Sequence, residues 1–320
     1  MKPNKRVGLF LLTVAVLILG TLPLILKLLV QVVDPVTLTW FRFTGSATIR
    51  AVLGRRGIFD DLKSNCSRRG VALALTTSAG LTGNYVFFMM GLQYLSPSTV
   101  HIVLQVAPFL VLAGGIVFFR EPLTLKLSWG VLLLAIGSAL FFNQRYEEIQ
   151  LGTDFVIGVG IALISAFGWA TFFLTQKALH PTMRSSTILF CCCSAGGIAL
   201  LPFASYASLA LLDDRLLIFL LCSTVATVIG YTSISTATRT IAATTMGLAL
   251  ATIPLVTMFA MMVLANSIEG LTQENLNATA ILGAMLVVVG LMIGTSGRKN
   301  SDPLVGTPES RGRASGLPVD

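Results

Sequence analysis

Ten apolar segments separated by short polar breaks constrain this chain more than any other feature of its sequence. Each segment is long enough to match the roughly 30 Å hydrocarbon core of a bilayer, at about 1.5 Å per helical residue. Of the 320 residues, 54% are hydrophobic and 11% are charged, and the charges cluster in the breaks. A transmembrane β-barrel would instead need alternating segments of about ten residues. We therefore predict an all-α polytopic membrane protein with ten transmembrane helices.

The predicted spans form two groups of five. The first group lies within residues 1–146 and the second within residues 147–296. The predicted spans are 7–29, 36–53, 71–93, 97–119 and 126–143 in the first group, and 155–176, 186–206, 216–236, 242–265 and 277–295 in the second. We expect the tail, 297–320, to be disordered because it is rich in Ser, Gly, Pro and Arg.

The distribution of Lys and Arg predicts the orientation of the spans. If the N-terminus is cytoplasmic, 17 of these residues fall in cytoplasmic segments and two fall outside. Cytoplasmic loops carry such an excess in membrane proteins. We therefore expect both termini, including the tail, in the cytoplasm. The net charge of +8 then reflects membrane orientation, and we expect the lipid bilayer, and no nucleic acid, as a partner.

A repeated pattern relates the two groups of spans. The stretch 97–109 aligns with 243–255, so that Pro108 falls on Pro254. Each copy is followed by Glu-x-Leu-Thr, at 121–124 and 269–272. Two glycines seven residues apart come next: Gly130 and Gly137 in the first copy, Gly283 and Gly290 in the second. Lys27 likewise matches Lys177.

Because five is an odd number, the second group must be inverted relative to the first. We therefore predict two inverted five-helix repeats. Inverted repeats are common among secondary transporters, which place the substrate site near mid-membrane between the two repeats.

This layout resembles the EamA-type transporters of the drug/metabolite transporter superfamily. The residues that carry the resemblance are Trp40-Phe-Arg-Phe, Pro108, Pro254, the two Glu-x-Leu-Thr turns and the paired glycines. The resemblance covers residues 7–295. It implies export or exchange of small metabolites across a bacterial inner membrane through a central cavity. The copies differ in places, since the second group has no match for Trp40-Phe-Arg-Phe.

Two polar residues in the fourth span are the first candidates for the substrate site. His101 and Gln105 lie at i and i+4 and share one helix face. Pro108 follows them and frees a backbone carbonyl. The aligned residues of the ninth span are Gly247 and Ala251, so the polar pair is not repeated. We predict that the pair lines the cavity; the alternative is a histidine hydrogen-bonded between helices.

Three further residues are predicted to complete the substrate site. Asn84 lies among the glycines of the third span and either lines the cavity or bonds another helix. Trp169 belongs to an aromatic stripe on the sixth span whose polar ends, Ser165 and Gln176, favour an inward face over lipid contact. Tyr231 lies in the hydroxyl-rich eighth span, where most hydroxyls are expected to bond carbonyls of their own helix.

Charged residues inside the spans narrow the substrate class. Arg42 is the one arginine well inside a span, and we favour structural anchoring over snorkelling or attraction of an anionic substrate group. No Asp or Glu lies in the middle of a span. A carboxylate-driven proton antiporter needs such an acid. If protons are coupled, His101 is the natural carrier. We expect a small neutral or zwitterionic, amino-acid-like metabolite as the substrate.

Two other classes of function compete with transport. An intramembrane enzyme needs a nucleophile with a base, or metal ligands, and the chain has only two histidines and no clustered acids. We therefore predict no enzyme activity, no cofactor and no metal site. A membrane-embedded sensor or assembly subunit is the alternative, although no soluble sensing domain is present in this sequence. The favoured hypothesis is a secondary transporter of the inner membrane, an exporter or exchanger working by alternating access.

Overall fold

The computed structural model describes residues 5–64, 67–143, 152–264, 268 and 277–296. The described residues are helical, without strands. The first group of helices comprises α1 (Lys5–Leu29), α2 (Pro35–Ser64), α3 (Arg68–Tyr94), α4 (Pro97–Val103), α5 (Val106–Phe119) and α6 (Leu125–Asn143). The second comprises α8 (Thr153–Leu179), α9 (Ser185–Leu200), η1 (Leu201–Phe203), α10 (Tyr206–Leu209), α11 (Asp214–Ala237), α12 (Ala243–Leu250), α13 (Ile253–Leu264) and α14 (Ala278–Ser296). The tail and the second Glu-x-Leu-Thr turn lie outside the described residues.

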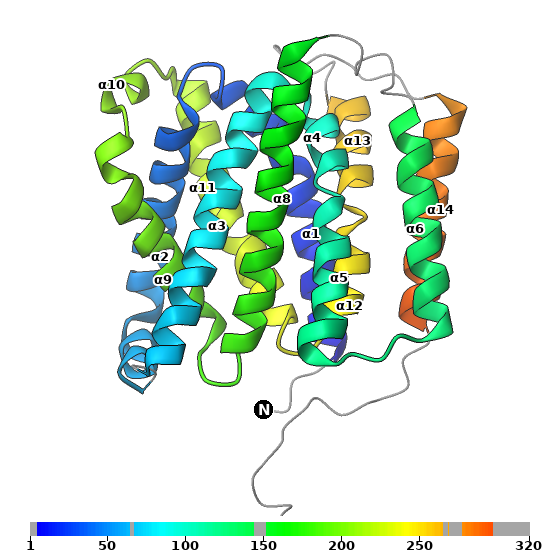
Figure 1. The fold of residues 1–320 in the computed structure, drawn as a ribbon. Helices are drawn as coiled ribbons and strands as arrows, with labels where there is room; N and C mark the ends of the chain where they lie inside the picture. The colour runs from blue at the N-terminus through cyan, green and yellow to red at the C-terminus, as the bar shows by residue number, and fades with distance from the viewer. Residues whose placement is uncertain (1–4, 65–66, 144–151, 265–267, 269–276, 297–320) are drawn as a thin grey trace, which may run out of the picture.

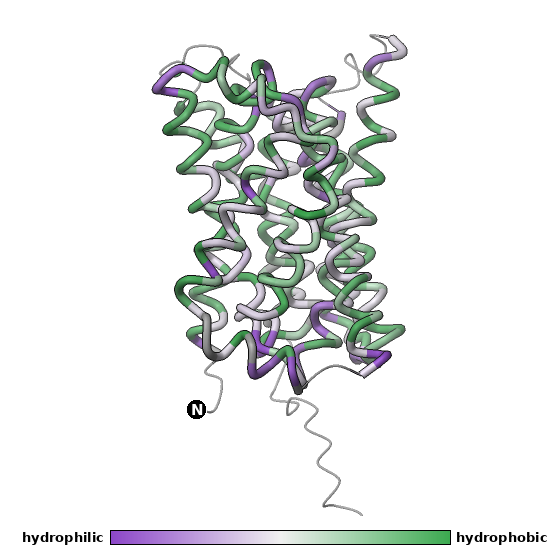
Figure 2. The backbone as a smooth tube through the Cα atoms, turned by 90° about the vertical axis from the view of Figure 1, so that its left-hand side faces the viewer, coloured by the Kyte–Doolittle hydropathy of each residue, from purple (hydrophilic) through white to green (hydrophobic). Residues whose placement is uncertain are grey.

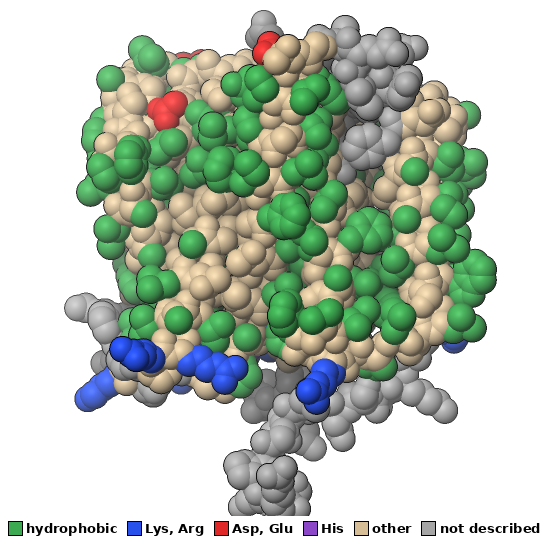
Figure 3. All heavy atoms as spheres, in the orientation of Figure 1, with side chains coloured by type: hydrophobic (Ala, Val, Ile, Leu, Met, Phe, Trp, Pro, Cys, Tyr) green, Lys and Arg blue, Asp and Glu red, His purple; other side chains and the backbone are tan. Residues whose placement is uncertain are grey.

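Among the described residues, seven helical segments are long and apolar enough to cross a membrane, as expected of a multi-pass membrane protein. Two more, within α6 and α14, are apolar but shorter. A helix satisfies all its backbone groups internally, as hydrocarbon requires. Figure 2 shows hydrophilic residues mainly at the two ends of the bundle. In Figure 3 the Lys and Arg side chains lie along the lower edge, around an otherwise largely apolar surface.

Helices of the first group pack mainly on helices of the second. The most extensive pairs are α3 with α8, α6 with α14, α1 with α11 and α2 with α9, followed by α5 with α12, α3 with α9 and α1 with α13. Figure 1 shows α6 and α14 side by side at one edge of the bundle. The core of each group is therefore built against the other group.

The paired glycines predicted from the repeat lie at the contact between α6 and α14. A Cβ atom at Gly130 would lie 2.7 Å from the Gly290 carbonyl oxygen, and one at Gly137 would lie 2.6 Å from the Gly283 carbonyl oxygen. Only glycine allows the two backbones to approach this closely. The earlier glycine of α6 meets the later glycine of α14, and the later one of α6 meets the earlier one of α14, so the two helices are antiparallel.

The two spans that contain Pro108 and Pro254 are each broken into two helices. The first break separates α4 from α5 and the second separates α12 from α13. Proline has no N–H, so the turn before it loses a helical hydrogen bond. At the first break the Ala107 amide instead donates to the Leu104 carbonyl at 2.9 Å. Each break thus begins three or four residues before its proline.

Candidate functional site

A cavity lies among the helices of the bundle, and about 680 Å³ of space not occupied by atoms lies within it and its open mouth. Its wall is formed by α1, α2, α3 and the broken spans of both groups, together with α8 and α11. Leucines and aromatic rings make nearly half of this wall, and both Pro108 and Pro254 belong to it. The cavity therefore draws on both repeats and contains both helix breaks.

The structure brings all five predicted site residues to the wall of this cavity. They are Asn84, His101, Gln105, Trp169 and Tyr231. All five are buried, with 4–8% of each residue exposed. They come from four different spans, so only the folded bundle brings them together. That they bind a substrate remains a prediction.

Asn84 both lines the cavity and bonds a neighbouring helix. Its Nδ2 donates to the Ser165 backbone oxygen at 3.1 Å and to Ser165 Oγ at 2.9 Å. Ser165 Oγ in turn donates to the Asn84 backbone oxygen at 3.0 Å. The contact is possible because Gly80 and Gly168 let α3 and α8 approach closely. Asn84 therefore fulfils both alternatives that the sequence left open, because it lines the cavity and also bonds another helix.

Gln105 connects the two helix breaks. Its Nε2 donates to the Ala251 carbonyl oxygen at 2.7 Å. The Ala251 carbonyl has lost its usual helical partner, because the Leu255 amide donates to Thr252 instead, at 3.1 Å. Gln105 thus satisfies a buried carbonyl that the break before Pro254 leaves open. One end of its amide group therefore has a structural role.

His101, unlike Gln105, has a side-chain nitrogen without a hydrogen-bond partner in the described part of the chain. Its ring lies 5.5 Å from the Phe88 ring, centroid to centroid. Its Nε2 has no hydrogen-bond partner among the described residues. A buried polar atom without a partner costs free energy unless something binds it. A polar group of a bound molecule, or water in the cavity, would satisfy this nitrogen.

Trp169 and Tyr231 belong to an aromatic cluster beside the cavity. The Trp169 ring stacks on Phe173 at 5.8 Å between centroids. The Tyr231 ring lies 5.3 Å from Tyr85 and 5.7 Å from Phe172. These rings come from α3, α8 and α11, so the cluster holds three helices in register around the cavity.

Two of the polar residues in the wall, Tyr85 and Arg42, were not predicted as part of the site. Tyr85 adjoins Asn84 in the chain, and Arg42 was favoured as an anchor. Arg42 is 1% exposed, and its Nη2 donates to Thr227 Oγ1 at 2.6 Å. Its guanidinium carbon lies 4.9 Å from the centre of the Tyr85 ring. The signal that pointed to Arg42 was its place, since a charge this deep in a span usually faces a cavity or a partner.

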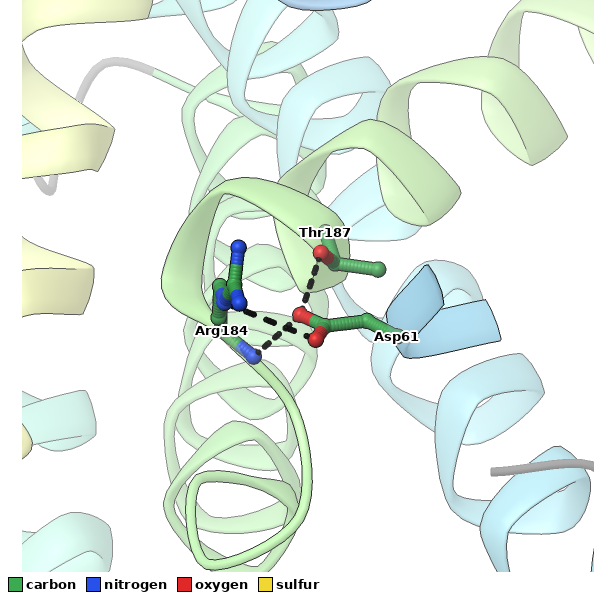
Figure 4. Close-up of polar contacts among 3 residues, drawn as sticks. All are labelled: Asp61, Arg184 and Thr187. Carbon is green, nitrogen blue, oxygen red and sulfur yellow. Dashed lines mark hydrogen bonds and ion pairs between the residues drawn. The ribbon is translucent and has the colours of Figure 1, made fainter. Parts of the chain in front are cut away.

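Ion pairs and hydrogen bonds join the two groups of helices at one end of the bundle. Lys177 pairs with Glu121 at 3.2 Å and also donates to the Ile241 carbonyl at 3.4 Å. Asp61 joins α2 to the start of α9. Its Oδ2 accepts from Thr187 Oγ1 at 2.8 Å and from the Arg184 amide at 3.0 Å, and Oδ1 pairs with the Arg184 guanidinium at 3.5 Å. Figure 4 shows the carboxylate of Asp61 bonded to Thr187 of α9 and to Arg184, which precedes this helix.

In the part of the chain that the structure describes, no three His, Cys, Asp or Glu side chains are grouped as metal ligands would be. Together, the fold and the cavity define a helical multi-pass membrane protein with a small-molecule-sized central cavity. The chain belongs to the EamA-like transporter family, whose model matches residues 6–143 and 156–295.

Relatives agree with this assignment, and a solved structure shares the fold. An "uncharacterized transporter" of Haemophilus influenzae is 28% identical over 305 residues, which are 93% of this chain and 98% of that protein. The "uncharacterized inner membrane transporter YhbE" of Escherichia coli is 28% identical over 302 residues, 93% of this chain and 94% of that protein. A solved crystal structure shares the fold with a TM-score of 0.67 at 16% identity, over 91% of this chain and 98% of that one. The protein is a membrane transporter.

Proposed function

We propose that this transporter moves a small neutral or zwitterionic, amino-acid-like metabolite across the cell inner membrane by alternating access, as an exporter or exchanger. The observation that carries the proposal is the central cavity, whose wall takes buried polar side chains from both repeats. A site between repeats near mid-membrane is what alternating access requires, because each repeat can then move against the other around a fixed site.

The proposal includes ten membrane crossings in two inverted repeats. Counting α2 and each broken span as one crossing, and including α6 and α14, gives five crossings in each half. The pairing of helices supports the inversion: exchanging the halves turns the α1–α11 contact into the α8–α3 contact. Lys27 and Lys177 also match: Lys27 of α1 donates to the Leu95 carbonyl just after α3, and Lys177 of α8 donates to the Ile241 carbonyl shortly after α11, the counterpart of α3 in the other half.

The inner membrane location and the cytoplasmic placement of both termini are also proposed. They rest on the excess of Lys and Arg in alternate breaks of the chain. The gathering of these side chains along one edge of the described surface agrees with that excess.

Flux through liposomes tests the proposal. Purified protein in liposomes should release small metabolites from a defined mixture faster than protein-free liposomes do. The change His101→Ala should lower this flux about fivefold, the value of roughly one hydrogen bond. His180→Ala is the matched control, because the other histidine lies outside the cavity wall and should leave the flux unchanged near pH 7.5.

Gel filtration in detergent measures the yield of folded protein. It shows whether a variant with reduced flux has lost part of its binding site or has failed to fold. Gln105→Ala is unsuitable as a variant of the site alone, since it also removes the hydrogen bond to the Ala251 carbonyl. Flux no faster than in protein-free liposomes, from folded protein, would contradict transport and favour a sensor or assembly subunit.

A further inference from the structure

Arg42 is the one charged side chain among the described residues that line the cavity. It lies on α2 and is 1% exposed, so it is almost completely removed from solvent. An arginine stays protonated in proteins. A positive charge is therefore held at the cavity wall in an otherwise mostly apolar setting.

The surroundings of Arg42 satisfy only part of its guanidinium. Nη2 donates to Thr227 Oγ1, and this hydroxyl donates onward to the Ser223 carbonyl at 2.8 Å. The face of the Tyr85 ring offers a weak attraction to the charge. Nε has no hydrogen-bond partner, and no carboxylate of the described residues pairs with the group. A buried charge without a counter-charge is costly.

Arg50 is a second buried arginine on the same helix, and its Nε likewise has no hydrogen-bond partner among the described residues. It lies eight residues after Arg42, and its guanidinium donates to Thr232 Oγ1 at 2.9 Å and to the Val228 carbonyl at 3.1 Å. Arg50 does not belong to the cavity wall. Both arginines bond α11, so anchoring α2 to α11 does not need a charge at the cavity. Position in the wall distinguishes Arg42.

We infer that Arg42 binds a carboxylate of the transported molecule, so that the substrate is a small monocarboxylate with an apolar body, such as an amino acid with an apolar side chain. This inference rests on the proposed transport function and names its substrate class. A guanidinium and a carboxylate match in charge and in hydrogen-bond geometry. Because the described wall holds a single positive charge, one carboxylate balances it, whereas a phosphate dianion would need a second cation.

The rest of the wall suits the other parts of such a molecule. Leucines from α1, α12 and the first break would contact the apolar body. An ammonium group would find aromatic faces, of which Trp169 and Tyr231 are two, because ring faces attract cations. His101 Nε2 lies in the same wall and is open to a hydrogen bond.

Binding to purified protein tests the inference. Leucine, methionine and phenylalanine, and the carboxamide of each, are titrated against the full-length protein in detergent. The rise in melting temperature reports the apparent affinity. The wild type should bind each acid about ten- to hundredfold more tightly than its amide, the range expected for a hydrogen bond to a charged group.

Variants then assign the preference to Arg42. Arg42→Gln should bring the ratio of acid to amide affinity close to one, and Arg42→Lys should keep part of the preference because it keeps the charge. Arg50→Gln is the matched control and should leave the ratio unchanged. An equal affinity of the wild type for acids and amides overturns the inference, and this measurement does not depend on any variant folding. A ratio that survives in folded Arg42→Gln also overturns it.

Efflux from liposomes loaded with the acids, the amides and uncharged ribose distinguishes two outcomes: a wrong carboxylate site in a working transporter, and a protein that does not transport. Protein-dependent release of the acids ahead of the amides and ribose supports both. Release of ribose or the amides without preference for the acids contradicts the carboxylate site and leaves transport standing. No protein-dependent release of any compound contradicts both.

Discussion

At the scale of single residues, the buried polar groups of this protein divide by whether the fold satisfies them. Asn84 and Gln105 donate to partners far away in the chain, and each of these partners belongs to the second repeat. His101 and Arg42 retain unpaired nitrogens beside the cavity. Satisfied groups stabilise the bundle, whereas open ones are available to a ligand. The division makes His101 and Arg42 the sharper candidates for substrate contact.

His180, just after α8, should make the protein sensitive to acid. Burial, and then the charge of Arg239, lower its pKa from 6.5 to about 3. Between these values the unfolded chain binds a proton that the folded protein does not, so stability falls as the pH drops below 6.5. The loss from this group amounts to about 2 kcal/mol between pH 7.5 and pH 5.

Melting curves of the wild type and His180→Gln at these two pH values test this expectation. The variant cannot take up the proton, so its melting temperature should fall less than that of the wild type. An equal fall in the two proteins would show that His180 does not titrate in this way.

At the scale of helices, close backbone contact decides how the halves meet. A Cβ atom on Gly168 of α8 would lie 2.9 Å from the Asn84 amide nitrogen and 2.9 Å from the Gly80 carbonyl oxygen of α3. Backbone atoms cannot turn aside as a flexible side chain can. The α3–α8 contact also holds Asn84 at the cavity, so this crossing connects packing to the site.

Gly168→Ala should therefore destabilise the protein, by about 1–3 kcal/mol as in other overpacked cores. Gly160 is the matched control on the same helix, because a Cβ atom there would meet nothing within 4 Å. Gly160→Ala should be neutral or slightly stabilising, since alanine favours helix. The two melting temperatures in detergent decide the question; equal values would mean that α3 and α8 separate without cost.

At the scale of the whole molecule, each half provides the packing surface of the other. The helix pairs α1–α11, α2–α9 and α3–α8 all join the first group to the second. The ion pairs of Asp61 and Glu121 also cross between the groups. Neither half encloses the cavity alone, because its wall includes α1, α3, α8 and α11.

Breaking the chain between Asn143 and Thr153 should therefore give two pieces that depend on each other. Expressed alone, neither half should accumulate as a folded membrane protein. Expressed together, the halves should purify as a complex and recover liposome flux. Copurification through a tag on one half is the measurement, and a half that is stable and monodisperse by itself would contradict the expectation.

Much of the architecture was predictable because it is recorded in local patterns. Apolar runs of membrane length predict helices wherever they occur, and the family match over 6–143 and 156–295 agrees with a duplicated chain. Pro108 and Pro254 each remove a helical hydrogen bond inside a predicted span, and the structure shows a break before each. The extension of α2 to Ser64 was not predicted, because the polar residues after Gly54 were interpreted as a connection.

The sequence by itself determined that the chain is a duplicated set of membrane helices, because helix formation in hydrocarbon depends on each segment's own backbone and apolar length. Only the tertiary structure decided which faces meet. It brought Asn84 to Ser165, Gln105 to Ala251 and Arg42 to Thr227, contacts that span 81, 146 and 185 positions of the chain. Such contacts depend on where small residues let two helices approach each other. The apolar pattern of one helix does not identify the helix that packs against it.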